Sequence, residues 1–147
     1  MGERLAGKIA IVTGAGSRGP GMGNGKAAAV LMAREAVGRW GALDILHNNV
    51  GIESRQTLMD TTEHEWDRVM AVDLKSMLLA TQAAVPALER RGGGAITCVS
   101  SVAALRGAGR TAYAAAKARA VYLASAEARW ITGQTLVVDG GLTLTTR

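Results

Sequence analysis

The sequence predicts a single α/β domain in which a parallel sheet of about four strands is covered by helices on both faces. Short, continuously apolar runs, typical of strands buried on both faces, alternate with longer segments of helical composition. The chain has 147 residues, enough for one domain with an ordinary core and too few for two full-sized ones. We therefore treat residues 1–147 as one domain.

Four apolar runs are the predicted strands. They are Lys8–Val12, Leu43–Leu46, Ala95–Val99 and Thr135–Val138. Each run is followed by glycine or polar residues, as expected where a strand ends. Helical crossovers make neighbouring strands parallel, so all carboxyl ends should meet at one edge of the sheet, where ligands bind in folds of this class. We expect the strands to lie side by side in chain order.

Three segments are the predicted helices. They are Lys26–Trp40, a segment from Thr61 or Thr62 to about Arg90, and Thr111–Arg129. The second begins at a threonine that can cap it and ends at a run of three glycines over residues 92–94. We expect Pro86 to kink or interrupt this helix, because proline lacks a backbone donor.

Composition and charge exclude several classes of function. The net charge is +5, but the basic residues are scattered, aromatic residues make up 3% of the chain, and Arg90–Arg91 is the one adjacent basic pair. This argues against nucleic-acid binding. No apolar run is long enough to span a membrane. Cys98 is the sole cysteine, and His47 and His64 fall in different elements, so we predict no disulfide, no metal site and a reducing, cytoplasmic location.

A glycine-rich loop follows the first predicted strand, and two frames fit it. Residues Gly14–Gly19 read GAGSRG, a literal GxGxxG; alternatively, Gly14 pairs with Gly21-Met22-Gly23, which leads directly into the helix at Lys26. In either frame glycine lets the backbone approach a phosphate, and the helix amino terminus offers free N–H groups to the anion. The loop predicts a phosphate or dinucleotide site. The alternative is a turn that merely connects the two elements.

A tyrosine and a lysine four residues apart predict acid–base chemistry. Tyr113 and Lys117 share one helix face. An ammonium beside a phenol stabilises the phenolate and lowers the phenol's pKa, so the tyrosine can exchange a proton with an alcohol or a carbonyl near neutral pH. Two serines, Ser100 and Ser101, stand about a dozen residues upstream at the end of the third predicted strand.

These motifs, in this order, resemble the short-chain dehydrogenase/reductase family. Thr13-Gly14 with Gly21-x-Gly23 resembles the family's TGxxxGxG, with three extra residues between. Asn48-Asn49-Val50-Gly51 resembles its NNAG segment, and residues 131–141 resemble its carboxyl-terminal strand. The resemblance covers nearly the whole chain and implies a Rossmann-like three-layer sandwich, here with a shortened parallel sheet.

The resemblance also implies the catalytic residues. Tyr113 and Lys117 match the family's YxxxK, with Tyr113 as general acid–base, while Ser101 matches the serine that binds the substrate oxygen. Ser101 precedes Tyr113 by one position fewer than the family pattern, so Ser100 remains an alternative. Asp73 stands where the family has an asparagine that completes a proton relay; an ionised aspartate cannot donate a hydrogen bond.

The implied function is an NAD(P)-dependent oxidoreductase that interconverts an alcohol and a ketone by hydride transfer, as a homo-oligomer. The implied cofactor-binding residues are Gly14, Ser17, Gly21, Met22, Gly23, Asn49, Gly51, Tyr113 and Lys117. NAD and NADP both remain open, because the strand that would carry the discriminating residue is missing. The substrate remains open because the loop that would select it is also missing.

Two internal segments present in the family are missing from this chain. The first join falls near Glu35–Ala36 and the second follows Lys117–Ala118, both within helical sequence. The strand–helix alternation therefore survives. An alternative interpretation follows from these gaps, namely a shortened nucleotide-binding or scaffold protein without turnover.

Overall fold

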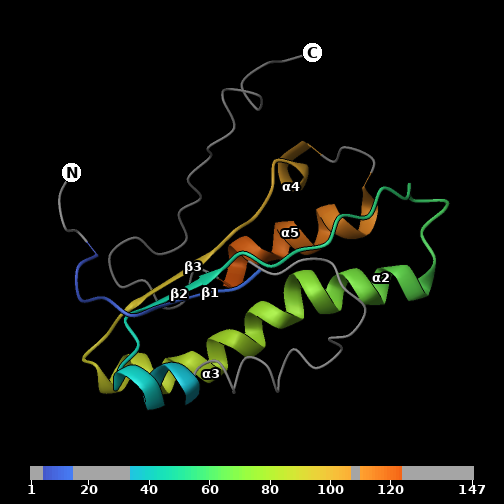
Figure 1. Ribbon diagram of the computed structural model, residues 1–147. Coiled ribbons are helices and arrows are strands. Elements are labelled where there is room, and N and C mark those ends of the chain that lie inside the picture. The colour runs from blue at the N-terminus through green and yellow to red at the C-terminus, as the bar shows by residue number, and fades with distance from the viewer. Residues whose placement is uncertain (1–4, 15–33, 107–109, 124–147) are drawn as a thin grey trace.

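A computed structural model describes residues 5–14, 34–106 and 110–123 (Figure 1). Its sheet has three parallel strands in the order β1-β2-β3, with bounds Ala10–Val12, Ile45–Asn48 and Ala95–Cys98. This parallel sheet, flanked by helices, confirms the predicted α/β, Rossmann-like class in a shortened form. The strands lie in chain order, as predicted. The fourth predicted strand, Thr135–Val138, lies outside the described residues.

The second strand begins and ends two residues later than predicted. Leu43 and Asp44 precede it, while His47 and Asn48, both polar, belong to it. The polar ends are tolerated because each finds a partner. The His47 Nδ1 atom lies 2.6 Å from Thr97 Oγ1 on β3. Asn48 pairs with Cys98 in the parallel ladder.

The predicted second helix is one continuous helical run in three parts. These are α2 (Glu63–Met70), the π-helical turn η1 (Ala71–Lys75) and α3 (Ser76–Arg90). Thr62 caps α2, its side chain accepting a hydrogen bond from the Glu65 N–H at 3.2 Å. The predicted cap is thus confirmed at Thr62. The sequence carried no sign of the π turn.

Of the two predicted effects of Pro86, a kink or an interruption, the interruption is wrong, because Pro86 lies inside α3. Proline removes the N–H that would bond the carbonyl of Gln82, one turn earlier. Both residues are exposed, so water can hydrogen-bond that carbonyl instead. The helix ends where predicted, since Gly92 and Gly93 adopt positive φ angles of 91° and 119°.

Helix α5 (Thr111–Leu123) begins at the predicted residue, and a short helix not foreseen from the sequence, α4 (Ala103–Arg106), precedes it. The remainder of the predicted segment, residues 124–129, lies outside the described residues. Residues 34–40 are helical, in agreement with the end of the first predicted helix. No helix in the described ranges is both long and apolar enough to cross a membrane.

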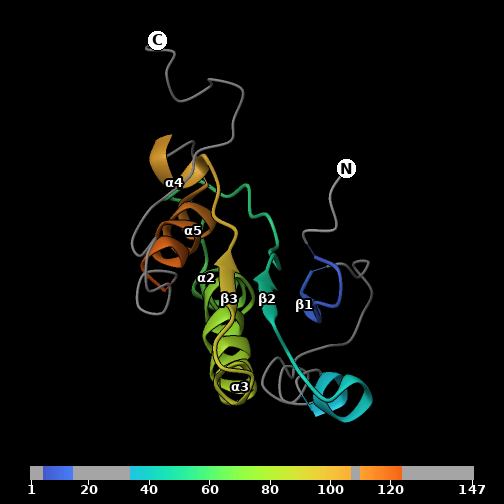
Figure 2. The ribbon, with the colours of Figure 1, turned by 90° about the vertical axis from the view of Figure 1, so that its left-hand side faces the viewer.

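Two clusters of buried side chains form the core. One joins the sheet to α3; its members are Leu43, Leu46, Ala80, Ala84, Ala87 and Leu88, with Ile9, Ile11, Val37 and Ile96 packed against it. The other joins α2 and η1 to α5, through Val69, Ala112 and Ala116. Helix α5 lies on the β3 side of the sheet (Figure 2). The small alanines let the helices approach closely.

The two faces of the sheet differ. Ile11, Leu46 and Ile96 point into the core cluster beside α3. Val12 and Thr97, on the opposite face, are exposed. Among the described residues, helix packing therefore covers the face beside α3.

The Asp44 side chain connects the segments that lie at the start of the sheet. Its carboxylate accepts hydrogen bonds from the Ile9 N–H at 3.0 Å, from Lys8 Nζ at 3.2 Å and from Arg91 Nε at 3.3 Å. Its main-chain oxygen accepts from the Ala95 N–H at 3.0 Å. The Ile9 N–H and the two cations hold the pKa of Asp44 below its ordinary value of 3.8. One side chain thus connects β1, β2 and the segment after α3.

Replacing Asp44 with asparagine should destabilise the fold at neutral pH, because the amide carries no charge to pair with Lys8 and Arg91. The pKa of Asp44 is lowered on folding, so its stabilising effect is present above the unfolded value of 3.8 and is lost as the pH falls through the folded value. Urea unfolding of Asp44→Asn and wild type, from neutral to strongly acidic pH, should show a difference that shrinks with acid. Asp67→Asn, at an exposed position on α2, is the control. A difference that stayed constant with pH would contradict this role.

Candidate active site

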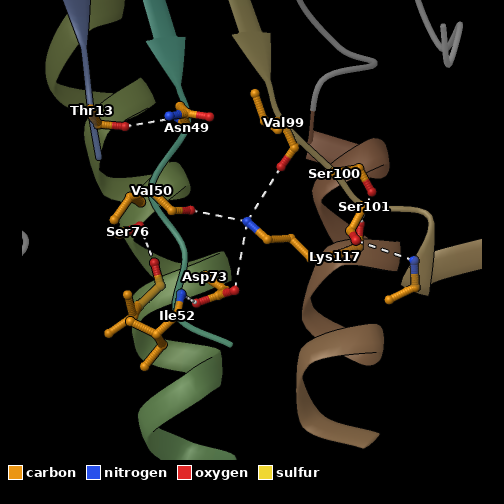
Figure 3. A network of polar contacts seen from close by, with 12 residues as sticks. Thr13, Asn49, Val50, Ile52, Asp73, Ser76, Val99, Ser100, Ser101 and Lys117 are labelled. Atoms are coloured by element: carbon orange, nitrogen blue, oxygen red, sulfur yellow. Dashed lines mark hydrogen bonds and ion pairs between the residues drawn. The ribbon is translucent and has the colours of Figure 1, made fainter. Parts of the chain in front are cut away.

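The ends of the three strands meet at one edge of the sheet, as the sequence predicted (Figure 3). The Thr13 N–H donates to the His47 carbonyl at 3.0 Å, and the Asn49 N–H donates to Thr13 Oγ1 at 3.1 Å. On the other side, the Val99 N–H donates to the Asn48 carbonyl at 2.8 Å. These bonds extend the pairing by one residue beyond the strands, and they align the segments that follow β1, β2 and β3.

Gly14 must be glycine for β1 and β2 to end this close together. Its φ angle is +79°, a conformation that side chains disfavour. A Cβ atom there would also lie 2.7 Å from the Cα of Val50 and 2.8 Å from its nitrogen. Gly14 therefore lets the start of the glycine loop pass against the residues that follow β2. Ser17, Gly21, Met22 and Gly23, the other predicted residues of this loop, lie outside the described residues.

Lys117 reaches from α5 to the ends of β2 and β3. Its Nζ atom donates to the carbonyl of Val50 at 3.0 Å and to that of Val99 at 3.5 Å, and it lies 3.7 Å from Asp73 Oδ2 (Figure 3). The residue is only 3% exposed. Burial lowers the pKa of Lys117, and the nearby Asp73 carboxylate opposes that shift.

Asp73 lies on the π turn η1 and is fully buried. Its Oδ1 atom accepts a hydrogen bond from the Ile52 N–H at 2.8 Å, while Oδ2 has no hydrogen-bond partner among the residues that the structure describes. At 3.7 Å, the contact from Oδ2 to Lys117 is an ion pair that is longer than a hydrogen bond. Burial raises the pKa of Asp73, against the opposing effects of the Ile52 N–H and Lys117.

Gly51 leaves the space in which this ion pair forms. A Cβ atom at Gly51 would lie 2.8 Å from Lys117 Nζ and 3.2 Å from Asp73 Oδ2. The backbone of Gly51 has no positive φ angle, so crowding is the reason that a side chain does not fit. The glycine of the NNVG segment is therefore matched to the lysine of α5, 66 positions away in the sequence.

Tyr113 lies beside Lys117, as the four-residue spacing predicted. Lys117 Nζ is 5.8 Å from the centroid of the Tyr113 ring. The ring is half-buried and packs against the cluster of Val69 and Ala116. Helix α5 thus brings the ammonium to the carboxyl edge of the sheet, with the centroid of the Tyr113 ring 5.8 Å from it.

Ser100 and Ser101 make different hydrogen bonds. Ser100 Oγ donates to the main-chain carbonyl of Lys117 at 2.7 Å, which attaches the end of β3 to α5. Ser101 Oγ accepts from the Ala103 N–H at 3.2 Å, at the start of α4. Ser100 therefore uses its proton within the fold. Among the described residues, the Ser101 hydroxyl receives a hydrogen bond and has none to which it donates.

Asn48 and Asn49 separate into buried and exposed roles. Asn48 is fully buried, and its Nδ2 atom donates to Thr81 Oγ1 at 3.4 Å and to Cys98 Sγ at 3.6 Å. The side chain of Asn49 is exposed at the sheet edge. The sequence reasoning missed the packing role of Asn48, as well as the carbonyls of Val50 and Val99. The position of Asn48 at the end of an apolar run could have indicated its packing role. The two carbonyls could not have been found from the sequence, because every residue has a main-chain carbonyl.

Comparisons with known proteins identify a family to which the chain is similar. A family model described as short chain dehydrogenase matches residues 24–138. A trans-4-hydroxycyclohexanecarboxylate dehydrogenase of Sinomonas cyclohexanicum is 47% identical over 83 residues, covering 56% of this chain and 32% of that protein. A 3-oxoacyl-[acyl-carrier-protein] reductase of Staphylococcus aureus is 37% identical over 109 residues, covering 74% and 44%.

Solved structures of short-chain dehydrogenases are also similar to this chain. The crystal structure of a short-chain dehydrogenase/reductase from Burkholderia xenovorans, itself assigned by similarity, has a TM-score of 0.72 and 29% identity, covering 82% of this chain and 67% of that one. A short chain dehydrogenase from Mycobacterium smegmatis has a TM-score of 0.62 and 37% identity, covering 67% and 42%. The chain spans between 32% and 44% of the length of the two curated relatives named above.

Replacing Gly51 with alanine should separate Lys117 from Asp73. The added methyl group must displace Lys117 Nζ, since 2.8 Å is too short for a carbon–nitrogen contact. We expect a loss of about 1–3 kcal/mol in the free energy of unfolding, the usual range for overpacking, measured by urea denaturation.

Gly38→Ala is the matched control. Gly38 lies in the helical residues 34–40, and a Cβ there has nothing within 4 Å. Alanine should stabilise the protein at this position by about 0.5–1 kcal/mol. Equal effects of the two substitutions would contradict the steric role of Gly51.

Proposed function

This chain belongs to the short-chain dehydrogenase family, and we propose that it interconverts an alcohol and a ketone by hydride transfer with NAD or NADP. The observation that carries the proposal is the position of Lys117. Its ammonium lies 5.8 Å from the Tyr113 ring centroid and 3.0 Å from the Val50 carbonyl, at the carboxyl edge of a parallel sheet. Ligands bind at this edge in open α/β sheets.

The described part of the edge supports a dinucleotide site. Gly14 and Gly51 each lack a side chain where a Cβ would meet protein atoms, so the segments that follow β1 and β2 lie close together at the edge where ligands bind. The exposed Asn49 lies beside them. We propose that Gly14, with Ser17, Gly21, Met22 and Gly23, holds the phosphates. The remaining contacts come from Asn49, Gly51, Tyr113 and Lys117. When bound, the nicotinamide supplies or accepts the hydride.

Tyr113 is the proposed acid–base residue. In alcohol oxidation, the substrate hydroxyl gives its proton to the Tyr113 phenolate oxygen as the hydride leaves the neighbouring carbon; in ketone reduction, the phenol returns the proton to the carbonyl oxygen. Lys117 places its positive charge 5.8 Å from the centroid of the Tyr113 ring, beside the proposed site of proton exchange.

Ser101 is the proposed donor to the substrate oxygen. Its hydroxyl accepts from the Ala103 N–H, which orients the oxygen and leaves its proton available. Ser100 is the weaker candidate because it already donates to the Lys117 carbonyl at 2.7 Å.

The alternative function is nucleotide binding, or a scaffold role, without turnover. The observation that favours it is the burial of Lys117, which is only 3% exposed. Its ammonium donates hydrogen bonds to the carbonyls of Val50 and Val99 and forms an ion pair with Asp73. A ribose would have to compete with these three protein oxygens for the ammonium.

Assembly and location remain predictions. Several large apolar side chains are exposed in the described residues, among them Leu58 at 74%, Met59 at 90% and Leu105 at 57%. We propose that a second copy of the chain covers some of this surface, which sedimentation would reveal as a mass above 15.2 kDa. Cys98 is free of any disulfide, in keeping with the proposed cytoplasmic location.

Cofactor binding is tested by titrating the protein with NADH and NADPH and following nucleotide fluorescence. We expect saturable binding of at least one of them, and comparing the two affinities identifies the preferred cofactor. Absence of binding at millimolar nucleotide would end the oxidoreductase proposal.

Turnover is tested with Tyr113→Phe. The relatives suggest two substrates to assay, an alicyclic secondary alcohol and a 3-oxoacyl thioester. We expect the variant, which lacks one hydroxyl among the proposed cofactor contacts, still to bind nucleotide but to lose about 10²–10⁴-fold in rate, the usual contribution of an acid–base group. Ser100→Ala and Ser101→Ala, compared in the same assay, distinguish the two serines. Binding without turnover in the wild type would favour the scaffold alternative.

A further inference from the structure

Asp73 and Lys117 form a buried pair of opposite charges that connects four segments of the fold. Lys117 comes from α5 and Asp73 from η1. The two carbonyls that complete the surroundings of the ammonium, those of Val50 and Val99, follow β2 and β3 (Figure 3). Asp73 is 0% exposed and Lys117 is 3% exposed.

We propose that Asp73 is a positioning residue that holds the Lys117 ammonium by its charge, and that this pair clamps the ends of β2 and β3 against η1 and α5 before any cofactor binds. This role goes beyond the proposed function, because the clamp needs neither nucleotide nor substrate. It also differs from the proton relay implied by the family's asparagine, since an ionised aspartate has no proton to donate.

The contacts of Asp73 require an aspartate. Its Oδ1 atom accepts from the Ile52 N–H at 2.8 Å, and its Oδ2 atom faces Lys117 Nζ at 3.7 Å. An asparagine has a single side-chain oxygen. If that oxygen accepted from Ile52, the amide NH₂ group would face the ammonium, donor against donor; if the amide turned over, the NH₂ would face the Ile52 N–H.

Asp73 is the acidic residue that faces Lys117 most closely. Cys98 on β3 and the ring of Tyr113 on α5 also lie near the ammonium. Arg68 on α2 acts on Asp73 from a greater distance, but its guanidinium binds Glu65, with Nε 2.7 Å from Oε2. Either charge left buried without the other would be strongly unfavourable, which makes each dependent on its partner.

A double-mutant cycle tests the clamp. Asp73→Asn, Lys117→Met and the double variant of the full chain are unfolded in urea near neutral pH without nucleotide. Each single variant should lower the urea midpoint, because it leaves one buried charge alone. The double variant should recover most of that loss, because no charge then remains at the site. Losses that simply add would overturn the proposal.

Matched controls come from exposed residues of the same helical run. Asp67→Asn on α2 and Lys75→Met on η1 remove the same kinds of charge from exposed positions. Both should change the midpoint little, and their effects should add. A recovery of similar size in this control pair would show that the coupling of Asp73 with Lys117 is not specific, and would also overturn the proposal.

A carbon-13 NMR titration of the wild type serves if a variant fails to fold. Interacting groups titrate together, so the carboxyl carbon of Asp73 should shift again at the pH at which the Cε of Lys117 reports loss of its proton. Where Asp73→Asn folds, Lys117 should lose its proton at lower pH than in the wild type. If Asp73 held Lys117 by packing alone and not by its charge, the pH midpoint of the Lys117 titration would be the same in the variant and the wild type. An Asp73 signal that is flat through the Lys117 transition would contradict the pair.

These measurements are independent of the oxidoreductase proposal. A coupled pair in a protein that binds no NADH or NADPH would support the clamp and end the proposed function. Nucleotide binding and turnover without coupling between Asp73 and Lys117 would support the proposed function and end the clamp proposal.

Discussion

The site depends on one interaction, the burial of a lysine ammonium among oxygens at the ends of two parallel strands. Lys117 reaches the carbonyls of Val50 and Val99 because β2 and β3 pair in register and end side by side. An ammonium this deeply buried requires a counter-charge and a full set of acceptors. Those requirements explain the other features of the site, namely the carboxylate on η1, the glycine at position 51 and the alanines that let α5 lie close to η1.

The strand order explains how a shortened chain can retain this edge. In the common doubly wound sheet, the first strand lies between the second and the fourth. If the segment missing near Glu35–Ala36 held the second and third strands, the first, fourth and fifth remain neighbours in chain order, as β1, β2 and β3 are here. The crevice between β2 and β3 would keep both its walls, and the loss would fall on the far side of β1. The region where an adenine ribose is normally recognised would be affected, while the residues around Tyr113 and Lys117 would not.

Much of the fold was predictable from local sequence. The strand–helix alternation predicted a parallel sheet, and Thr62 was recognisable as a helix cap because a threonine before an acidic, amphipathic segment satisfies free N–H groups. The errors have tertiary causes. His47 and Asn48 belong to a strand because the neighbouring strand β3 and the helix α3 supply partners for their polar side chains. Pro86 stays within a helix because it faces solvent, and the π turn at Asp73 accompanies a contact to Ile52, far away in the sequence.

The sequence by itself determined the order of the elements, the shared helix face of Tyr113 and Lys117, and the glycines at positions 14 and 51, since spacing and residue type are local properties. The tertiary structure decided which atoms meet. Ser100, and not Ser101, binds the Lys117 carbonyl, and the Asp73 carboxylate faces the Lys117 ammonium. Lys117 bonds the main chain of Val50, 67 positions away. Main-chain carbonyls are the same in every residue, so only the folded backbone selects the ones that receive the lysine.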